Sequence, residues 1–361
     1  MSGNFGKKIN LSIFGESHGK AIGIVINGIE PGIKIDLDKI EQDMARRAPG
    51  KNSLSTQRKE GDSFEILSGF FEGYTTGTPL SIMIRNNDTK SKDYSKIKDL
   101  VRPSHGDFSG FVKYNGFNDY RGGGHFSGRI TAPLVFAGAL AKQILESKGI
   151  YVGAHISRVG KVVDDSFDKV NLNKGVLDSV LDKELPLLNE EKIDDIKQEI
   201  LHARQNGDSV GGAIECGIVG INPGIGSPFF DSLESTISHL AFSVPAVKGI
   251  EFGLGFDFAK ENASKVNDEY YIENGEVKTY TNNNGGIVGG ITNGMPVIFK
   301  VAIKPTPSIS KEQRTINVRT MEEEILKVEG RHDPCIVQRA VVVIEAIAAI
   351  AVLELLWFLE L

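Results

Sequence analysis

The order of strand-like and helical segments most constrains the fold of this chain. Eight runs mix β-branched residues with glycine and end in turn residues, which predicts strands. These runs cover residues 9–14, 21–28, 64–71, 80–85, 152–159, 211–219, 247–253 and 296–303. Helical periodicity predicts helices over 37–48, 130–147, 190–206, 233–242 and 337–359. Because strands and helices do not alternate regularly, an α+β fold is favoured over a doubly wound parallel sheet.

Signals at the helix ends support this reading. Asp36 is a good N-cap for the helix at 37–48, and Pro49 stops that helix. Asn206-Gly207 closes the helix at 190–206, because glycine takes the left-handed conformation that ends many helices. No Pro- or Ser-rich linker divides the chain, so we expect one domain over residues 1–361.

Composition excludes some classes of protein. A hydrophobic content of 40% and a charged content of 24% are ordinary for a soluble globular chain. A net charge of −6 argues against a general nucleic-acid or anionic-membrane binder. Cys216 and Cys335 are far apart in sequence and form no disulfide framework, so a reducing cytoplasm is the expected location.

The C-terminal segment 340–361 is very apolar, but Glu345 and Glu354 interrupt it. No charge-free run approaches the ~20 residues that a spanning helix needs. We therefore expect a buried or subunit-contacting helix and no membrane association. The N-terminus has no apolar run and does not resemble a signal peptide.

Three consecutive glycines, Gly122 to Gly124, directly follow Arg121 and precede the second predicted helix. Glycine has no Cβ, so its backbone can take a positive φ and lie close against a ligand. The N–H groups of such a loop form a concave anion site, and the next helix adds its positive end. Ser127 could supply a hydroxyl group and His125 a titratable ring. The segment predicts a loop that holds a phosphorylated molecule, with a plain glycine-rich turn as the alternative.

Histidines in two further loops are candidate proton carriers. His18 lies between small residues after a predicted strand, where a side chain faces a cleft more often than a core. His105 lies in a loop that Pro103 and Gly106 hold to a turn. Neutral histidine at pH 7 is a natural proton carrier. A structural turn around His18 and a hydrogen-bonded loop histidine at position 105 are the alternatives.

Other candidate site residues lie at the ends of predicted elements. Arg46 and Arg47 end the first helix, where they either clamp phosphate or carboxylate oxygens or simply favour the helix dipole. The loop 304–308 carries donors stiffened by two prolines, which suits a phosphate, an electron-rich ring or a plain strand exit. Asp333 precedes the last helix, either as a proton-transfer carboxylate or as its N-cap.

Several kinds of site are excluded by spacing. Only three residues separate Gly15 from Gly19, and Ala21 replaces the Ser or Thr of a P-loop, so nucleotide hydrolysis is not expected. Ser17 lacks the nucleophile elbow, and no Gly-x-Gly-x-x-Gly follows a strand. No metal is expected, because the candidate histidines lie in separate loops without the i, i+4 spacing of a zinc helix. These are His18, His105, His125 and His332.

Together these segments favour an enzyme that acts on a small, multiply anionic molecule. Arginines, histidines and glycine loops all lie at element ends in a chain of negative net charge. Two other readings remain open at this point. One is a flavin- or nucleotide-dependent oxidoreductase that transfers hydride, and the other is a non-catalytic carrier of flavin or a phosphorylated ligand.

Five of these segments, in this order, resemble the motifs of the chorismate synthase family, and the resemblance covers essentially the whole chain. The segments read Phe14-Gly-Glu-Ser-His-Gly19, Arg46-Arg-Ala-Pro-Gly50, Arg102-Pro-Ser-His105, Asp119-Tyr-Arg-Gly-Gly-Gly124 and Gly330-Arg-His-Asp-Pro-Cys335. The resemblance implies a single-domain β-α sandwich of antiparallel sheets and helices, assembled as a homotetramer. It also implies the last step of the shikimate pathway in aromatic amino acid biosynthesis. In that step, anti-1,4-elimination of the 3-phosphate and the C6 proton from 5-enolpyruvylshikimate 3-phosphate gives chorismate, with reduced FMN required.

The resemblance also assigns roles to residues. His18 and His105 match two histidines, of which one protonates reduced flavin and the other the leaving phosphate, and Asp333 matches the carboxylate that helps remove the C6 proton. The implied substrate-binding residues are Arg46, Arg47, Ser127, Arg129 and Arg331. The implied flavin-contacting residues are His125, Phe126, Ser127, Pro245, Ala246, Gly289, Lys304, Pro305, Thr306, Pro307, Ser308 and Arg331. Arg47 also matches a position associated with NADPH, a candidate indirect reductant.

The chain departs from the family pattern in two places. Many homologues have Arg-Ser-Ser-Ala-Arg-Glu after the triple glycine, where this chain has His125-Phe-Ser-Gly-Arg-Ile130. Many also have an arginine near position 53, where this chain has Ser53, and this weakens the expectation of tight NADPH binding. We see no added reductase domain, so the enzyme is expected to be monofunctional, with reduced flavin supplied by an external reductase.

Overall fold

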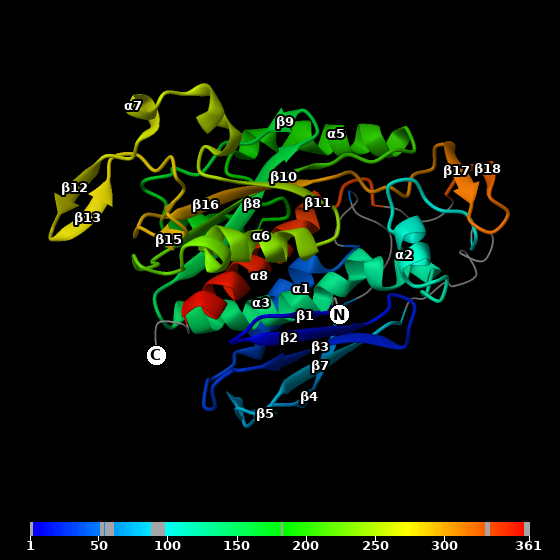
Figure 1. Cartoon of the computed structure of the whole chain (residues 1–361), viewed down its shortest axis with the longest axis horizontal. Coiled ribbons are helices and arrows are strands. Elements are labelled where there is room, and N and C mark those ends of the chain that lie inside the picture. Colours follow the sequence, from blue (N-terminus) through cyan, green and yellow to red (C-terminus); the bar gives the residue numbers. More distant parts are fainter. Residues whose placement is uncertain are drawn as a thin grey trace.

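Two antiparallel five-stranded sheets enclose a layer of helices (Figure 1). The computed structural model describes residues 3–50, 54, 61–87, 98–181, 183–328 and 333–356. The first sheet has the order β1-β2-β3-β7-β4, with bounds Asn4–Phe5, Asn10–Gly15, Ala21–Asn27, Leu80–Arg85 and Phe64–Ser68. The second has the order β11-β16-β10-β8-β9, with bounds Val247–Phe252, Val297–Ile303, Gly212–Val219, Tyr151–Val159 and Val162–Val163.

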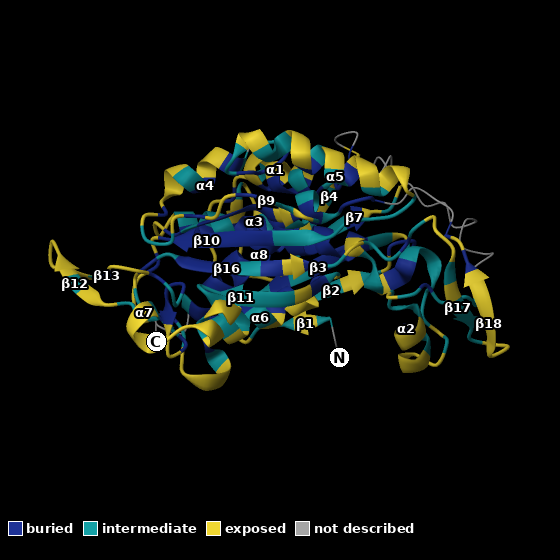
Figure 2. Ribbon diagram, turned by 90° about the horizontal axis from the view of Figure 1, so that it is seen from above, coloured by how far each residue is buried: buried dark blue, intermediate teal, exposed yellow. Residues whose placement is uncertain are grey.

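Four helices form the layer between the sheets, and two more cover the far side of the second sheet (Figure 1). The inner helices are α1 (Leu37–Arg47), α3 (Thr131–Glu146), α6 (Leu233–Ser243) and α8 (Val337–Leu356). The outer helices are α4 (Lys174–Leu181) and α5 (Ile193–Gln205). Figure 2 shows exposed residues along α5, whereas Ile196 and Ile200 on its inner face are buried. This arrangement confirms the predicted α+β sandwich.

The hydrophobic core forms where the sheets meet the helix layer. Alternation places Ile22, Ile24 and Ile26 of β3 on the inner face of the first sheet, where all three are buried. The helices α3 and α8 approach closely at Gly138, where an added Cβ would overlap the Cβ of Ala346. The largest core cluster extends from Ile9 to the end of α8, so the two sheets and the helices share one core.

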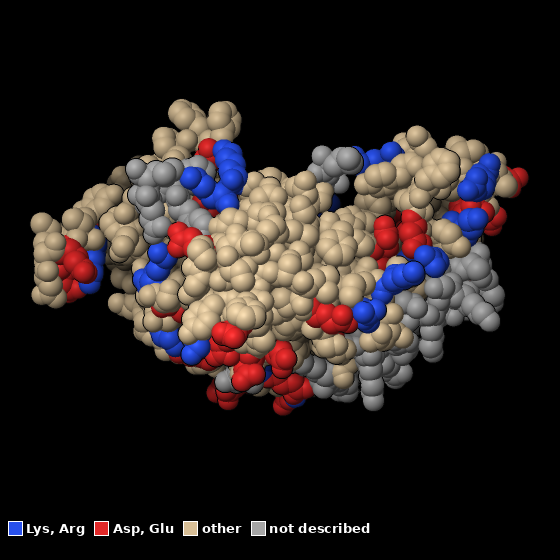
Figure 3. All heavy atoms as spheres, turned by 90° about the horizontal axis from the view of Figure 1, so that it is seen from below, with Lys and Arg blue, Asp and Glu red and all other residues tan. Residues whose placement is uncertain are grey.

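The outer face of the first sheet carries few charges. Seen from below, the centre of this face is uncharged over its described residues, and acidic and basic side chains lie around its edges (Figure 3). Phe14 and Leu67 are among its exposed apolar side chains. Phe14 lies over Gly23 of the neighbouring strand, where any larger residue would overlap the ring.

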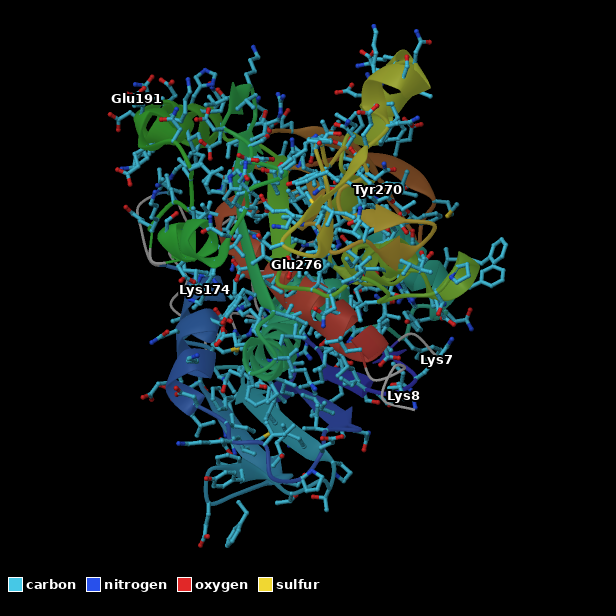
Figure 4. The ribbon with its side chains drawn as sticks, turned by 90° about the vertical axis from the view of Figure 1, so that its left-hand side faces the viewer. Lys7, Lys8, Lys174, Glu191, Tyr270 and Glu276 are labelled. Atoms are coloured by element: carbon cyan, nitrogen blue, oxygen red, sulfur yellow. The ribbon has the colours of Figure 1, made fainter. Side chains whose placement is uncertain are left out.

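The helix α8 is buried, as the sequence predicts, and both of its glutamates have partners. Glu345 accepts two hydrogen bonds of 2.6 Å from Arg46. Glu354 accepts from the backbone N–H groups of Lys7 and Ile9 at 2.6 and 2.7 Å. Figure 4 shows Lys7 and Lys8 beside the C-terminal end of this helix. Because both carboxylates have hydrogen-bond partners, this largely apolar helix can carry two acidic residues in the core.

In the described part of the chain, no helix is both long enough and apolar enough to cross a bilayer.

The predicted elements recur with small shifts at their ends. Asp36 caps α1 as predicted, accepting from the N–H of Asp38 at 3.1 Å, and Gly207 follows α5 with a φ of 63°. Two boundaries were wrong. The predicted strand 64–71 breaks at Gly69, whose φ is 82°, and continues as β5 (Phe70–Phe71). The predicted helix 190–206 starts with a separate 3-10 turn at Glu190–Lys192.

The remaining elements were not predicted, because they are short or exposed. Two hairpins, β12–β13 (Tyr270–Glu273, Glu276–Thr279) and β17–β18 (Gln313–Asn317, Glu322–Leu326), project from opposite ends of the molecule (Figures 1 and 2). The other short strands are β6 (Tyr74–Thr75), β14 (Ile287–Val288) and β15 (Ile291–Thr292). The other helices are α2 (Asp107–Lys113) and α7 (Ala263–Val266). Further 3-10 turns are η2 (Arg121–Phe126), η3 (Gly128–Ile130), η5 (Phe229–Asp231) and η6 (Gly255–Lys260).

Candidate active site

The glycine loop, residues 121–126, has the conformation that its composition predicts. Gly122, Gly123 and Gly124 have φ values of 58°, 86° and 52°, which residues with a Cβ seldom adopt. The loop is fixed to the end of β2, because the N–H of Ser17 donates to the carbonyl of Gly124 at 3.2 Å. The hydroxyl of Ser17 also donates to the carbonyl of Gly122 at 3.1 Å.

The two candidate histidines lie against consecutive glycines of this loop. A Cβ at Gly122 would overlap the ring of His18. A Cβ at Gly123 would lie 3.0 Å from Cε1 and 3.1 Å from Nε2 of His105. The structure therefore brings together two imidazoles that are 87 positions apart (105 − 18) in the chain. The absence of side chains at both glycines makes room for the rings.

A carboxylate and a guanidinium hold His105. Its Nδ1 lies 2.6 Å from Oδ1 of Asp107, the first residue of α2. Arg102 donates to the same carboxylate from Nε at 2.7 Å and from a terminal nitrogen at 2.8 Å. Burial alone would raise the pKa of Asp107, but hydrogen bonds from Arg102 and His105 outweigh it and hold that pKa far below its ordinary value. Asp107 is therefore ionised at neutral pH.

A second carboxylate, the buried Asp62, joins two predicted clamp arginines. Arg47 donates from Nε to Asp62 at 2.6 Å, and a terminal nitrogen of Arg129 donates to its other oxygen. All three side chains are buried. Burial is the main cause that lowers the pKa of Arg47, and the positive charges of Arg339 and Arg129 lower it further, against the opposing effect of Asp62.

Asp333 forms an ion pair with Arg339, which lies in the first turn of α8. The positive charge of Arg339 also lowers the pKa of Arg47, which shows that this pair lies near the cluster around Asp62. The combined cluster holds three guanidinium groups, those of Arg47, Arg129 and Arg339, against two carboxylates. Among these described side chains, positive charges outnumber negative charges by one, which favours an anionic ligand in a buried setting.

The loop 304–308 packs against the loop of His105. Lys304 donates from Nζ to the carbonyl of Ser104, and its N–H donates to the carbonyl of Ala246 at 2.9 Å. Ser308 accepts from Arg102 at 3.4 Å. Ala246 has a φ of 76°, an uncommon value for alanine that marks this turn, with Pro245 exposed before it. Among the described residues, the buried hydroxyl of Thr306 has no hydrogen-bond partner.

The residues after the triple glycine have structural contacts of their own. The Nδ1 atom of His125 lies 2.8 Å from the carbonyl oxygen of Gly15. The ring of Phe126 packs on α2, where a Cβ at Gly110 would lie 2.6 Å from it. The Ser127 hydroxyl accepts from the N–H of Arg129 at 3.3 Å and so caps the turn η3.

Two predicted site residues lie away from the histidines and from the arginines around Asp62, and a third is not described. Arg46 points the other way from Arg47 and pairs with Glu345 and with Asp43, the latter at 3.0 Å. Gly289 lies in the turn between β14 and β15, at the opposite end of the molecule from α2 (Figure 1). Arg331 lies outside the described residues, as does His332.

Several residues of the cluster were not assigned a role from the sequence. Arg102 and Asp107 flank His105 in a segment that was singled out, so their spacing could have suggested that they hold the ring. Arg339 had the weaker signal of a basic residue near the start of a predicted helix. Asp62 had none, because a lone aspartate in a polar segment looks like any surface residue.

The family model described as "Chorismate synthase" matches residues 9–357. A chorismate synthase of Pyrococcus abyssi is 47% identical over 354 residues, which cover 98% of this chain and 97% of that protein. One of Methanobrevibacter smithii is 43% identical over 358 residues, covering 98% of this chain and 96% of the relative. A solved structure, "Crystal Structure of Chorismate Synthase", aligns with a TM-score of 0.78 at 30% identity, over 98% of this chain and 93% of that one. This chain belongs to the chorismate synthase family.

Proposed function

We propose that this chain converts 5-enolpyruvylshikimate 3-phosphate into chorismate and phosphate by anti-1,4-elimination. This lyase reaction is the final step of the shikimate pathway, and family membership supports it. One observation carries the proposal: His18 and His105 lie against consecutive glycines of one loop, Gly122 and Gly123, and Arg47, Arg102 and Arg129 are buried arginines. That combination suits a reaction that expels a phosphate and moves a proton.

The arginine cluster would bind the anionic groups of the substrate. Breaking an allylic C–O bond to phosphate puts charge on the leaving group, and fixed guanidinium groups stabilise that charge. Arg47 and Arg129 are the predicted binding residues in the cluster, and we add Arg339 because it shares their surroundings. Ser127 and Arg331 remain proposed substrate contacts. We assign Arg46 an indirect part, because its contact with buried Glu345 fixes the end of α1 that carries Arg47.

The loops around the histidines fit a flavin. The buried Thr306 hydroxyl lacks a partner among the described residues, and the guanidinium of Arg102 contacts the same loop through Ser308, which would suit a phosphate-bearing cofactor. We propose that reduced FMN is held by His125, Phe126, Ser127, Pro245, Ala246, Lys304, Pro305, Thr306, Pro307, Ser308 and Arg331. Bound reduced flavin supplies electron density that side chains cannot. NADPH is a candidate indirect reductant, with Arg47 as its proposed contact.

Three side chains would handle protons. One of His18 and His105 holds the proton for the leaving phosphate, and the other holds a proton beside the flavin. Asp333 takes part in removing the proton from C6, and its ion pair with Arg339 fixes it for that role. Groups of this kind typically contribute about 10²–10⁴-fold each to a rate.

The position of Gly289 supports an assembly of several copies of the chain. It lies far from the other proposed flavin contacts, so a flavin role for it requires a second copy of the chain (Figure 1). This agrees with the homotetramer that we propose. We also propose a cytoplasmic location and an external flavin reductase as a partner.

An anaerobic assay of phosphate release with dithionite-reduced FMN tests the proposal. We expect chorismate and phosphate in equal amounts, with no net change in the flavin spectrum over turnover. A net spectral change would instead support a hydride-transferring oxidoreductase. Tight binding without product would support a carrier. In the His105→Ala variant, an enzyme loses turnover while it still binds FMN, whereas a carrier loses nothing.

A further inference from the structure

We infer that Asp107 is a positioning residue for His105. It fixes the neutral imidazole as the tautomer that carries its proton on Nδ1, and it leaves Nε2 directed at the glycine loop. The inference rests on the proposed function, in which His105 handles a proton at this site. It is supported by the contacts of His105 with Asp107, Arg102 and Gly123.

The first support is the geometry of the ring. Nδ1 of His105 lies 2.6 Å from Oδ1 of Asp107. An ionised carboxylate can only accept hydrogen bonds, so Nδ1 must donate. The other edge of the ring faces Gly123, where a built Cβ would lie 3.1 Å from Nε2. The ring is therefore held at one nitrogen and faces the glycine loop with the other.

The second support is the position of Arg102. One of its terminal nitrogens lies 3.2 Å from Nδ1 of His105 as well as 2.8 Å from Asp107. A guanidinium only donates hydrogen bonds. Without the carboxylate, Nδ1 would face a donor and become an acceptor, so the proton of the neutral ring would move to Nε2. The negative charge of Asp107 therefore decides which nitrogen carries the proton.

A purely structural role accounts for some contacts of Asp107 but not for its contact with the His105 ring. Asp107 is the first residue of α2, where an acidic side chain favours the helix dipole. Asp107 also accepts from the backbone N–H of Arg102 at 3.0 Å, which helps to hold the loop. Both carboxylate oxygens accept from the guanidinium of Arg102, and one of them also contacts His105. Arg102 in turn donates to Ser308, so the unit connects the histidine to the loop 304–308.

Nitrogen-15 NMR of protein labelled at histidine tests the inference, because the two ring nitrogens report directly which of them is protonated. The His105 signals are identified by their loss in His105→Gln. We expect the Nδ1–H tautomer in the wild-type protein and the Nε2–H tautomer in Asp107→Ala. In Asp107→Asn, the amide oxygen should take the position that accepts from the backbone N–H and Nε of Arg102, which turns the NH2 group toward Nδ1, so the tautomer should again change to Nε2–H.

The turnover rate should fall when the tautomer of His105 changes. We expect Asp107→Ala to lower kcat by about 10²-fold with little change in KM, because a wrong tautomer impairs proton transfer. Asp107→Asn should lower kcat to a similar extent, because its amide NH2 group favours the same wrong tautomer. Asp99→Ala is the matched control: it also removes a carboxylate paired with an arginine, Arg319, but one that touches no histidine. It should leave both the tautomer and kcat unchanged.

The outcomes separate this inference from the proposed function. An Nε2–H tautomer in the wild-type protein, or an unchanged tautomer in Asp107→Ala, would overturn the inference even if the wild-type protein releases phosphate. Absence of phosphate release by the wild-type protein would overturn the proposed function and leave the NMR result standing. The wild-type measurement needs only His105→Gln, for the assignment of the signals, so the test holds even where Asp107→Ala does not fold.

Discussion

The guanidinium of Arg339 donates a hydrogen bond to the carboxylate of Asp333. This contact joins the loop before α8 to the first turn of that helix, and it places Asp333 beside the arginine cluster. The sequence allowed Asp333 to be either a cap of α8 or a carboxylate that transfers protons. The ion pair is compatible with both roles, and the Asp333→Asn variant separates them.

Asp333→Asn should slow phosphate release by about 10²-fold or more, because the amide cannot accept a proton as a carboxylate does. The fold should be nearly unchanged, since the amide oxygen can still accept from Arg339. Thermal unfolding and circular dichroism check the fold beside the activity assay. A protein that unfolds at assay temperature would show that Asp333 mainly holds the start of α8.

Gly122→Ala should abolish most turnover, because a Cβ there would overlap the ring of His18. Gly149→Ala is the matched control. Its φ of 79° is also positive, but a Cβ there meets nothing within 4 Å. Both variants carry the cost of a left-handed alanine, roughly 1 kcal/mol, which urea unfolding measures. Equal activity in the two variants would contradict the idea that Gly122 makes room for the imidazole.

Arg47→Ala should weaken substrate binding, seen as a 10-fold or larger rise in KM, where about 1.4 kcal/mol corresponds to each tenfold step. Its guanidinium is buried beside Asp62 and next to two other arginines, where charge acts strongly on a bound anion. Calorimetric titration with the substrate in the absence of flavin measures the affinity directly. An unchanged affinity would remove Arg47 from the binding cluster.

Arg46→Ala should lower the stability of the fold and leave KM nearly unchanged, in contrast to Arg47→Ala. It removes the bidentate partner of fully buried Glu345, whose pKa is held at about 2 despite burial by the charges of Arg46 and Lys142. Breaking such a pair costs about 3–5 kcal/mol, which urea unfolding would detect. The KM of the folded fraction should stay near the wild-type value. A large rise in KM without loss of stability would place Arg46 in contact with substrate after all.

Stability should depend on pH through His155, which is buried between Asp164 at 3.1 Å and Glu215 at 2.9 Å. Burial alone would lower the pKa of His155, but its hydrogen bonds to the two carboxylates raise it above 6.5. The stabilisation is therefore fully present below pH 6.5 and is lost as pH rises through the higher pKa of the folded state.

The free energy of unfolding, measured in urea from pH 6 to pH 9, should show this decline. His155→Gln should remove it, and His202→Gln, at an exposed position in α5, should not. A wild-type curve that is flat over this range would contradict the prediction.

Local patterns predicted most of the framework. Asp36 caps α1, Gly207 follows the end of α5, and the interior strands β3 and β16 lie close to their predicted positions, because caps and strand runs depend on neighbouring residues. The hairpins β12–β13 and β17–β18 were not predicted. Their residues are largely exposed, so no hydrophobic periodicity marks them.

The site was predicted in part. The sequence selected His18, His105 and the triple glycine, because these residue types are unusual in their local setting. It could not show that Gly122 and Gly123 each receive one of the rings. It also could not separate Arg46 from Arg47, which are adjacent in sequence but turn to different carboxylates, Glu345 and Asp62. Successive helical residues point about 100° apart, and only the surrounding elements decide what each of them meets.

The sequence by itself determined the α+β class, the ends of the main helices, the buried character of α8 and the short motifs that mark the family. Each of these depends on residues close together in the chain. The tertiary structure alone decided that Asp62 binds Arg47 and Arg129 and that Asp333 meets Arg339. The contacts of Asp62 join segments that are distant in sequence, and they form because a buried charge must find an opposite charge wherever the fold brings one.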